Sequence, residues 1–203
     1  MKVELQARPE SKQVRLERPT TRYANPEQSE TCFQRGKVEQ QANRLKEAIE
    51  LYGRAAMYDP GNFKALCNAG SCYRALGRLS EARDMYRKAI RQCPSDAISH
   101  YNLANTERIL GNFDVAIEEY EVVVRHGGAL VLDSWVNMGI SYKNIEQYGK
   151  AVECCQSALR LRPGESSAVF NWAMILMAEL EFMNKEVFIS VRRDKAEKAA
   201  ELF

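Results

Sequence analysis

The sequence repeats itself about every 34 residues, and this period constrains the fold more than any other feature of the chain. Five small residues mark it, at Gly36, Gly70, Ala104, Gly139 and Ala173. Three further positions recur in step with the first four of them: small residues at Ala48, Ala82, Ala116 and Ala151, then Tyr52, Tyr86, Tyr120 and Cys155, then Ala55, Ala89, Val123 and Ala158. So many coincidences in one register indicate a repeated structural unit.

The pattern within each unit predicts two antiparallel helices. Small residues at two matched positions let the helices approach closely, and the tyrosines fill the space beside them. Gly77 and Gly111 fall between the two helices of their units, where a turn requires a backbone conformation that glycine adopts readily. Pro60, Pro94 and Pro163 follow the second helices and end them.

This pattern resembles the tetratricopeptide repeat (TPR) family. The best-matching unit carries the family's residues at Leu66, Gly70, Tyr73, Ala82, Tyr86, Ala89 and Pro94, and another carries them at Trp135, Gly139, Tyr142, Ala151, Ala158 and Pro163. The resemblance implies an all-α fold, a right-handed TPR superhelix or solenoid of four repeats at 29–62, 63–96, 97–131 and 132–165. We expect residues 1–28 to form an extended basic arm.

Beyond residue 165 the repeat pattern decays. Ser166 or Ser167 is suited to cap a helix that ends near Met183, and a second helix is expected from Lys185. Residues 166–203 are therefore predicted to form a divergent fifth repeat, a capping hairpin with one face for the stack and one for water.

Composition narrows the class of function. The chain is 45% hydrophobic with a formal net charge of +2, which argues against a disordered chain and gives no reason to expect a nucleic-acid partner. No apolar run is long enough to predict a membrane span. We expect an intracellular, cytoplasmic protein, with cytoskeletal or ciliary association as an alternative.

No catalytic or metal-binding motif is found. The two histidines, His100 and His126, are not at metal-ligand spacing from a cysteine, and neither Cys67/Cys72 nor Cys154/Cys155 forms a CxxC pair. Cys155 occupies a packing position of the repeat, so it is interpreted as a buried structural thiol. The sequence predicts no enzyme, no cofactor and no metal.

One side-chain amide recurs in every repeat, two residues before the small marker, at Gln34, Asn68, Asn102, Asn137 and Asn171. Asparagine is a mediocre helix former, so its recurrence inside helices requires a reason. In TPR proteins this position points into the concave groove, where an amide can donate to and accept from an extended peptide backbone. The line is similar to the asparagine ladder of the TPR arm of O-linked N-acetylglucosamine transferase. Alternatively, the amides bond to carbonyl groups of neighbouring helices and hydrate the groove.

Basic residues form a second line, six positions after the amides, at Arg74, Arg108 and Lys143, and Lys64 lies near its N-terminal end. Three cations in successive repeats favour an acidic or phosphorylated ligand. Alternatively, they lie on the groove rim, solvated or paired with acidic side chains of the next helix.

A chaperone-tail receptor is not expected. TPR proteins of that kind hold a terminal carboxylate with Lys and Asn on the first helix, Asn on the third, and Lys and Arg on the fifth. The matching positions hold Phe33 and Lys37, Asn68, and Ile98 and Asn102. One of five agrees.

The sequence thus predicts a non-catalytic scaffold or adaptor that binds an extended, acidic segment of a protein partner within a multi-protein complex. The alternative is a structural subunit of a large ciliary or cytoskeletal assembly, anchored by its N-terminal arm and its apolar C-terminal end.

Overall fold

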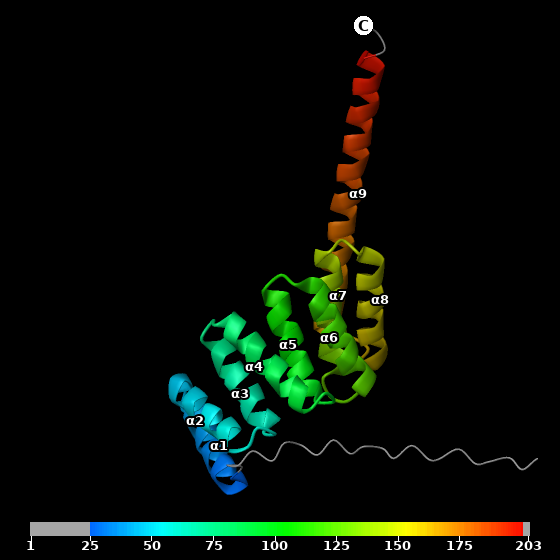
Figure 1. Cartoon of the computed structure of the whole chain (residues 1–203). Helices are drawn as coiled ribbons and strands as arrows, with labels where there is room; N and C mark the ends of the chain where they lie inside the picture. Colours follow the sequence, from blue (N-terminus) through cyan, green and yellow to red (C-terminus); the bar gives the residue numbers. More distant parts are fainter. Residues whose placement is uncertain (1–24, 201–203) are drawn as a thin grey trace, which may run out of the picture.

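The computed structural model describes residues 25–200, with side chains as far as Ser190 except that of Phe188. Within this range the chain forms nine helices and no strand. The first eight pair into four hairpins: α1 (Pro26–Gln41) with α2 (Leu45–Tyr58), α3 (Phe63–Ala75) with α4 (Leu79–Gln92), α5 (Ala97–Ile109) with α6 (Phe113–His126), and α7 (Val131–Asn144) with α8 (Tyr148–Leu161). They stack in chain order, and α9 (Ser166–Ala200) follows at the far end (Figure 1). The fold is an all-α TPR solenoid.

Within each of the first two hairpins a glycine faces a buried tyrosine ring. A Cβ atom added to Gly36 would lie 2.8 Å from the Tyr52 ring, and one added to Gly70 would lie 2.7 Å from the Tyr86 ring. Both rings are fully buried. The small and large positions of the sequence pattern are therefore the two sides of one close contact between paired helices.

The core is a row of local clusters, each of which joins one hairpin to the next. Tyr52 of α2 packs with Cys72 of α3, Tyr86 of α4 packs with Leu103 of α5, and Tyr120 of α6 joins a cluster with α7 and α8. Since no cluster spans the whole chain, each hairpin is stabilised mainly by its immediate neighbours.

Turns inside the hairpins use a left-handed residue, as the glycines predict. Gly77 and Gly111 have φ of 74° and 82°. The first and fourth hairpins place Asn43 (φ 59°) and Glu146 (φ 61°) at the same point. These two residues have a backbone conformation that glycine adopts more readily than residues with a side chain.

Polar caps fix where several first helices begin. Asn62 and Asp96 accept hydrogen bonds from the backbone N–H of Ala65 and Ser99, at 3.0 and 2.9 Å. Asn25 caps α1 in the same way, so α1 begins at Pro26, before the repeat boundary expected at Ser29. Residues 1–24, most of the predicted basic arm, lie outside the described residues.

The C-terminal region differs from the predicted hairpin. Instead of two helices separated near Lys185, α9 is one continuous helix of 35 residues. Its sequence contains no Gly or Pro that would stop a helix, and Asn184 alone does not break it. The first half of α9 packs on α7 and α8 through the buried Ala168 and Ile175, and the second half runs past the stack (Figure 1).

None of the helices among residues 25–200 is both long and apolar enough to cross a membrane.

Candidate peptide-binding face

The first helices of successive hairpins, together with α9, lie side by side and form one face of the stack. We call it the first-helix face: the surface made by α1, α3, α5, α7 and α9. All five predicted amides stand on it, one per helix. Asn102 and Asn137 bond to residues of the neighbouring first helices α3 and α5, whereas Asn68 bonds to Tyr52 of α2.

The three central amides donate to side chains of the preceding hairpin. Asn68 Nδ2 lies 3.4 Å from the Tyr52 hydroxyl, and Asn102 Nδ2 lies 3.7 Å from Cys67 Sγ. Asn137 Nδ2 lies 3.3 Å from Asn105 Oδ1. These contacts are long for hydrogen bonds and therefore weak. They orient the amides without using their oxygens, which accept no hydrogen bond from the described residues.

The two ends of the amide line are less constrained. Gln34 is exposed, and its Nε2 donates to Glu30 Oε1 of its own helix at 2.6 Å. Asn171 is half-buried on α9 and forms no hydrogen bond with the described residues. Among the described residues, none of the five amides bonds to a helix carbonyl, which was the partner expected under the alternative interpretation.

Two of the predicted cations lie beside buried tyrosine hydroxyls. The Arg74 guanidinium is near the hydroxyl of Tyr86, and that of Arg108 is near the hydroxyl of Tyr120. Burial raises the pKa of Tyr120 to about 12, and Arg108 opposes this rise. The Nε atom of Arg108 is itself buried without a partner among the described residues.

The other basic positions are freer. The fourth hairpin has Cys155 where the others have tyrosine, so Lys143 has no such hydroxyl beside it. Lys64 is exposed, with Nζ 6.0 Å from the centre of the Phe63 ring. Within residues 25–190, none of Arg74, Arg108, Lys143 and Lys64 pairs with a carboxylate.

A small cavity of about 210 Å³ opens on the N-terminal part of this face, between α1, α3 and α5. Its lining combines two predicted site residues with apolar side chains and one carboxylate: Lys64 and Asn68, with Phe33, Phe63, Cys67, Asp96 and Ile98. Ile98 remains 56% exposed, so apolar surface is presented directly beside the amide line. Sequence reasoning did not predict this cavity. Its only signal is that Phe33 and Cys67 each directly precede an amide.

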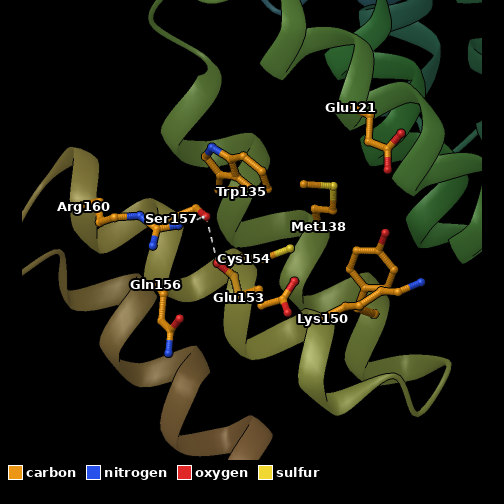
Figure 2. A pocket seen from close by; sticks show the side chains of 10 residues that line it. Glu121, Trp135, Met138, Lys150, Glu153, Cys154, Gln156, Ser157 and Arg160 are labelled. Atoms are coloured by element: carbon orange, nitrogen blue, oxygen red, sulfur yellow. Dashed lines mark hydrogen bonds between the residues drawn. The ribbon is translucent and has the colours of Figure 1, made fainter.

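A second cavity, of about 310 Å³, lies between α6, α7 and α8 (Figure 2). Trp135, Met138 and Tyr142 line it from α7, and Lys150 and Glu153 from α8. None of the nine predicted binding residues contributes to it. Carboxylates and cations are mixed around it, so its charge does not select one type of ligand.

Two adjacent cysteines of α8 are held as thiols by their burial. Cys154 and Cys155 are buried and unpaired, which confirms Cys155 as a buried thiol. Burial raises the pKa of Cys154 to about 12 and that of Cys155 to about 11, so both remain thiols at neutral pH. Among residues 25–200 no three His, Cys, Asp or Glu side chains come together as a metal site would require.

Stacked helical hairpins with these packing positions define the tetratricopeptide repeat proteins. Sequence models of the tetratricopeptide repeat match residues 33–97, 85–118 and 132–165, and the chain belongs to this family. No curated protein sequence matches the chain.

Solved structures with the same fold include MamA, at TM-score 0.71 and 18% identity, covering 86% of this chain and 95% of MamA. YrrB, described as a TPR protein with an unusual peptide-binding site, has TM-score 0.65 and 20% identity over 84% of this chain and 90% of YrrB. The first TPR of Spaghetti (RPAP3), bound to the HSP90 peptide SRMEEVD, has TM-score 0.57 and 16% identity over 60% of this chain and 98% of that one. At such low identities these likenesses show a shared fold.

Proposed function

We propose that this chain is a non-catalytic, cytoplasmic scaffold that binds an extended segment of a partner protein along its first-helix face. The observation that carries the proposal is the orientation of Asn68, Asn102 and Asn137. Each holds its NH₂ group against the preceding hairpin, and its oxygen accepts no hydrogen bond from the residues that the structure describes. An oxygen placed in this way accepts a hydrogen bond from a peptide N–H and reads backbone rather than side chain.

Affinity in this arrangement comes from more than the amides. A neutral hydrogen bond contributes about 0.5–1.5 kcal/mol, so the amide line alone supports micromolar binding or weaker. The cavity beside Asn68 adds an apolar anchor, since burial of one large apolar side chain is worth about 1.5–3 kcal/mol. We therefore propose a ligand with an apolar residue that enters the cavity between Phe33 and Phe63.

The preferred ligand is acidic. Arg74, Arg108 and Lys143 follow the amide line, and none of them forms an ion pair within the described residues. Two of the structural neighbours support a peptide ligand in general terms, because YrrB is described by its peptide-binding site and the RPAP3 domain holds an acidic peptide. The chaperone-tail clamp is not proposed here, since Phe33 and Ile98 stand where that clamp has cations.

A displayed library of 12-residue peptides tests the proposal. The library is selected on the purified protein, and the recovered peptides are then measured by fluorescence anisotropy against the variant Asn102→Ala/Asn137→Ala. We expect affinity to fall about tenfold or more, since two hydrogen bonds of about 1 kcal/mol are lost.

The matched control is Asn144→Ala. Asn144 also lies on α7, but it is exposed and donates to the carbonyl of Ile140 in its own helix at 2.7 Å. This control should leave affinity unchanged. Equal affinity of the double variant and the wild type would contradict the proposed role of the amides.

The alternative is a structural subunit of a large cytoskeletal or ciliary assembly. The observation that favours it is the exposed apolar surface of α9, where Phe170 and Val187 are 65% and 61% exposed. Deletion of residues 1–24 tests the part assigned to the arm: loss of co-purifying chains supports this alternative, and their full retention argues against it.

A further inference from the structure

Two neighbouring first helices, α3 and α5, each hold an arginine against a buried tyrosine hydroxyl. Arg74 lies beside the hydroxyl of Tyr86, and Arg108 lies beside that of Tyr120. Both tyrosine rings are fully buried. Because the two arginines occupy the same repeat position on adjacent helices, their guanidinium groups stand at the same level of the first-helix face. We call Arg74 and Arg108 the arginine pair.

The fold does not require a cation at this repeat position. Helix α1 has Gln40 there, and the Tyr52 hydroxyl donates to Gln40 Oε1 at 2.7 Å. A neutral amide thus makes the contact with a buried tyrosine that the arginines make in the next two hairpins. The packing of a hairpin therefore does not explain the positive charge that α3 and α5 carry.

The arginine pair is not neutralised by the part of the chain that the structure describes. No ion pair within residues 25–190 includes Arg74 or Arg108. Helix α3 contains no acidic residue, and Glu107, the one acidic residue of α5, is buried and paired with Arg87 of α4 at 2.9 Å. Arg108 Nε is also buried without a hydrogen-bond partner in this range, which is a costly arrangement for a charged donor. An anion bound beside the pair would relieve that cost.

The arginine pair lies next to the amide line. Asn105 Oδ1 accepts from the Tyr120 hydroxyl at 2.7 Å and lies 3.3 Å from Asn137 Nδ2. Only the Tyr120 hydroxyl and the Asn105 amide therefore stand between the Arg108 guanidinium and an amide of the line. A peptide backbone held by the amides brings even a short side chain within reach of the arginine pair.

The number of positive charges distinguishes between possible anions. A carboxylate has one negative charge and two oxygens, which a single guanidinium group can hold in a bidentate contact. A phosphate on a serine or threonine carries a charge of about −1.5 to −2 at pH 7 and has three acceptor oxygens. The axes of packed helices lie about 8–10 Å apart, and two arginine side chains can meet across this distance. Two guanidinium groups thus match one phosphate better than one carboxylate.

We propose that the partner segment bound on the first-helix face carries a phosphorylated serine or threonine, whose phosphate Arg74 and Arg108 hold together. The Tyr86 and Tyr120 hydroxyls position the two guanidinium groups. This inference rests on the proposed peptide-binding function and adds the chemical class of one ligand residue to it.

A synthetic library of 12-residue peptides with one fixed phosphoserine tests the proposal on the whole chain. Each selected peptide is made again with serine and with glutamate at the fixed position, and the three forms are compared by fluorescence anisotropy. We expect the phosphoserine form to bind about tenfold or more tightly than the serine form, because charge-assisted hydrogen bonds to two arginines are gained. The glutamate form should bind more weakly than the phosphoserine form.

Equal affinity of the phosphoserine and glutamate forms would overturn the phosphate assignment. So would a phosphoserine library that yields no binder while the unphosphorylated displayed library yields peptides that depend on Asn102 and Asn137. In both cases the proposed peptide binding stands and only its phosphate specificity is lost.

The variant Arg74→Gln/Arg108→Gln removes the arginine pair. The ratio of phosphoserine to serine affinity should lose its preference for phosphate, whereas a folding defect would weaken both forms alike and leave the ratio unchanged. Glutamine is the residue that α1 has at this position, so the buried tyrosines keep a partner. The matched control is Arg54→Gln, which removes an exposed arginine of α2 and should preserve the ratio. A ratio that survives in the double variant contradicts the proposal.

NMR of the arginine Nε–H groups locates the phosphate. The Nε–H resonance of Arg108 should shift when the phosphoserine form is added and should shift much less with the serine form. A resonance that does not move while affinity still depends on the phosphate would place the phosphate elsewhere, and the assignment to the arginine pair would then be wrong.

Discussion

The contact between Gly70 and Tyr86 shows how single residues set the geometry of this fold. The ring of Tyr86 is fully buried and leaves no space for a Cβ atom on the facing helix. The third hairpin places Ala104 at the same position, beside Tyr120, whose hydroxyl donates to Asn105 at 2.7 Å. The packing between the two helices of a hairpin therefore depends on which small residue stands at this position.

Gly70→Ala is expected to destabilise the protein by about 1–3 kcal/mol, because the new methyl group overpacks against a ring that cannot move aside. The matched control is Gly53→Ala on α2, where a Cβ atom meets nothing within 4 Å. This control should stabilise by about 0.5–1 kcal/mol through helix propensity alone. Urea denaturation of both variants measures the difference, and equal effects would contradict the packing argument.

His100 is the buried titratable group with the clearest consequence for stability. Its Nδ1 faces the Glu119 carboxylate and its Nε2 lies 3.0 Å from the Pro94 carbonyl oxygen. A carboxylate and a backbone carbonyl both accept hydrogen bonds, so this arrangement favours the cationic ring, in which both nitrogens donate. The hydrogen bond to Glu119 is the main cause that raises the pKa of His100 above its ordinary 6.5.

A raised folded-state pKa gives a stabilisation that is complete below pH 6.5 and is lost as pH rises through the higher folded value. We expect the free energy of unfolding to fall in that window for the wild type, and this fall to be absent in His100→Gln. The control is His126→Gln, since His126 is exposed and its Nδ1 bonds to the carbonyl of Val122 in its own helix. Denaturation at a series of pH values checks both, and an unchanged slope in His100→Gln would refute the assignment.

At the scale of one element, the turn inside each hairpin needs one residue with a left-handed backbone. The second and third hairpins have glycine there, and the first and fourth do not. Glu146 adopts the left-handed conformation that Gly77 and Gly111 adopt in their hairpins, with φ of 61°. A side chain in this conformation costs roughly 1–2 kcal/mol because its Cβ approaches the following carbonyl.

Glu146→Gly should therefore stabilise the protein by about 1 kcal/mol, whereas Gly77→Ala should destabilise it by a similar amount. Thermal unfolding of the two variants compares the same turn position in opposite directions. A lower midpoint for Glu146→Gly would show that its side chain contributes more than its backbone costs.

The whole molecule is a linear stack rather than a body with one centre. Local clusters join each hairpin to the next, so a change at one end should weaken near neighbours most. Helix α9 closes the last of these clusters by covering Ala151, Cys155 and Ala158 of α8.

Deletion of residues 166–203 is expected to speed amide hydrogen exchange in α7 and α8 by at least tenfold and to leave α1–α4 nearly unchanged. Mass spectrometry of exchanged peptides measures each helix separately. Uniform acceleration along the stack would instead mean that the protein unfolds as a single cooperative unit. A chain that keeps α9 as far as Ser190 serves as the control, because Ile175 and the packed half of the helix remain.

The repeat sequence alone determined the all-α solenoid, because contacts between a hairpin's helices and with its neighbours depend on residues at fixed spacing. Gly70, Ala82 and Tyr86 are sufficient to predict a close helix pair, and the structure has one there. The positions of the amides on the first helices were also predictable, since helical phase places Asn68, Asn102 and Asn137 alike.

Some features depend on a contact between distant parts of the chain, or on the lack of such a contact. Only the tertiary structure decided these features. Whether the NH₂ group or the oxygen of each amide forms a hydrogen bond depends on Tyr52, Cys67 and Asn105, which lie on other helices. The cavity beside Lys64 needs three hairpins to form. The straight course of α9 leaves Leu180, Met183 and Val187 exposed, because nothing in residues 166–200 breaks the helix and no second helix among the described residues returns to cover them.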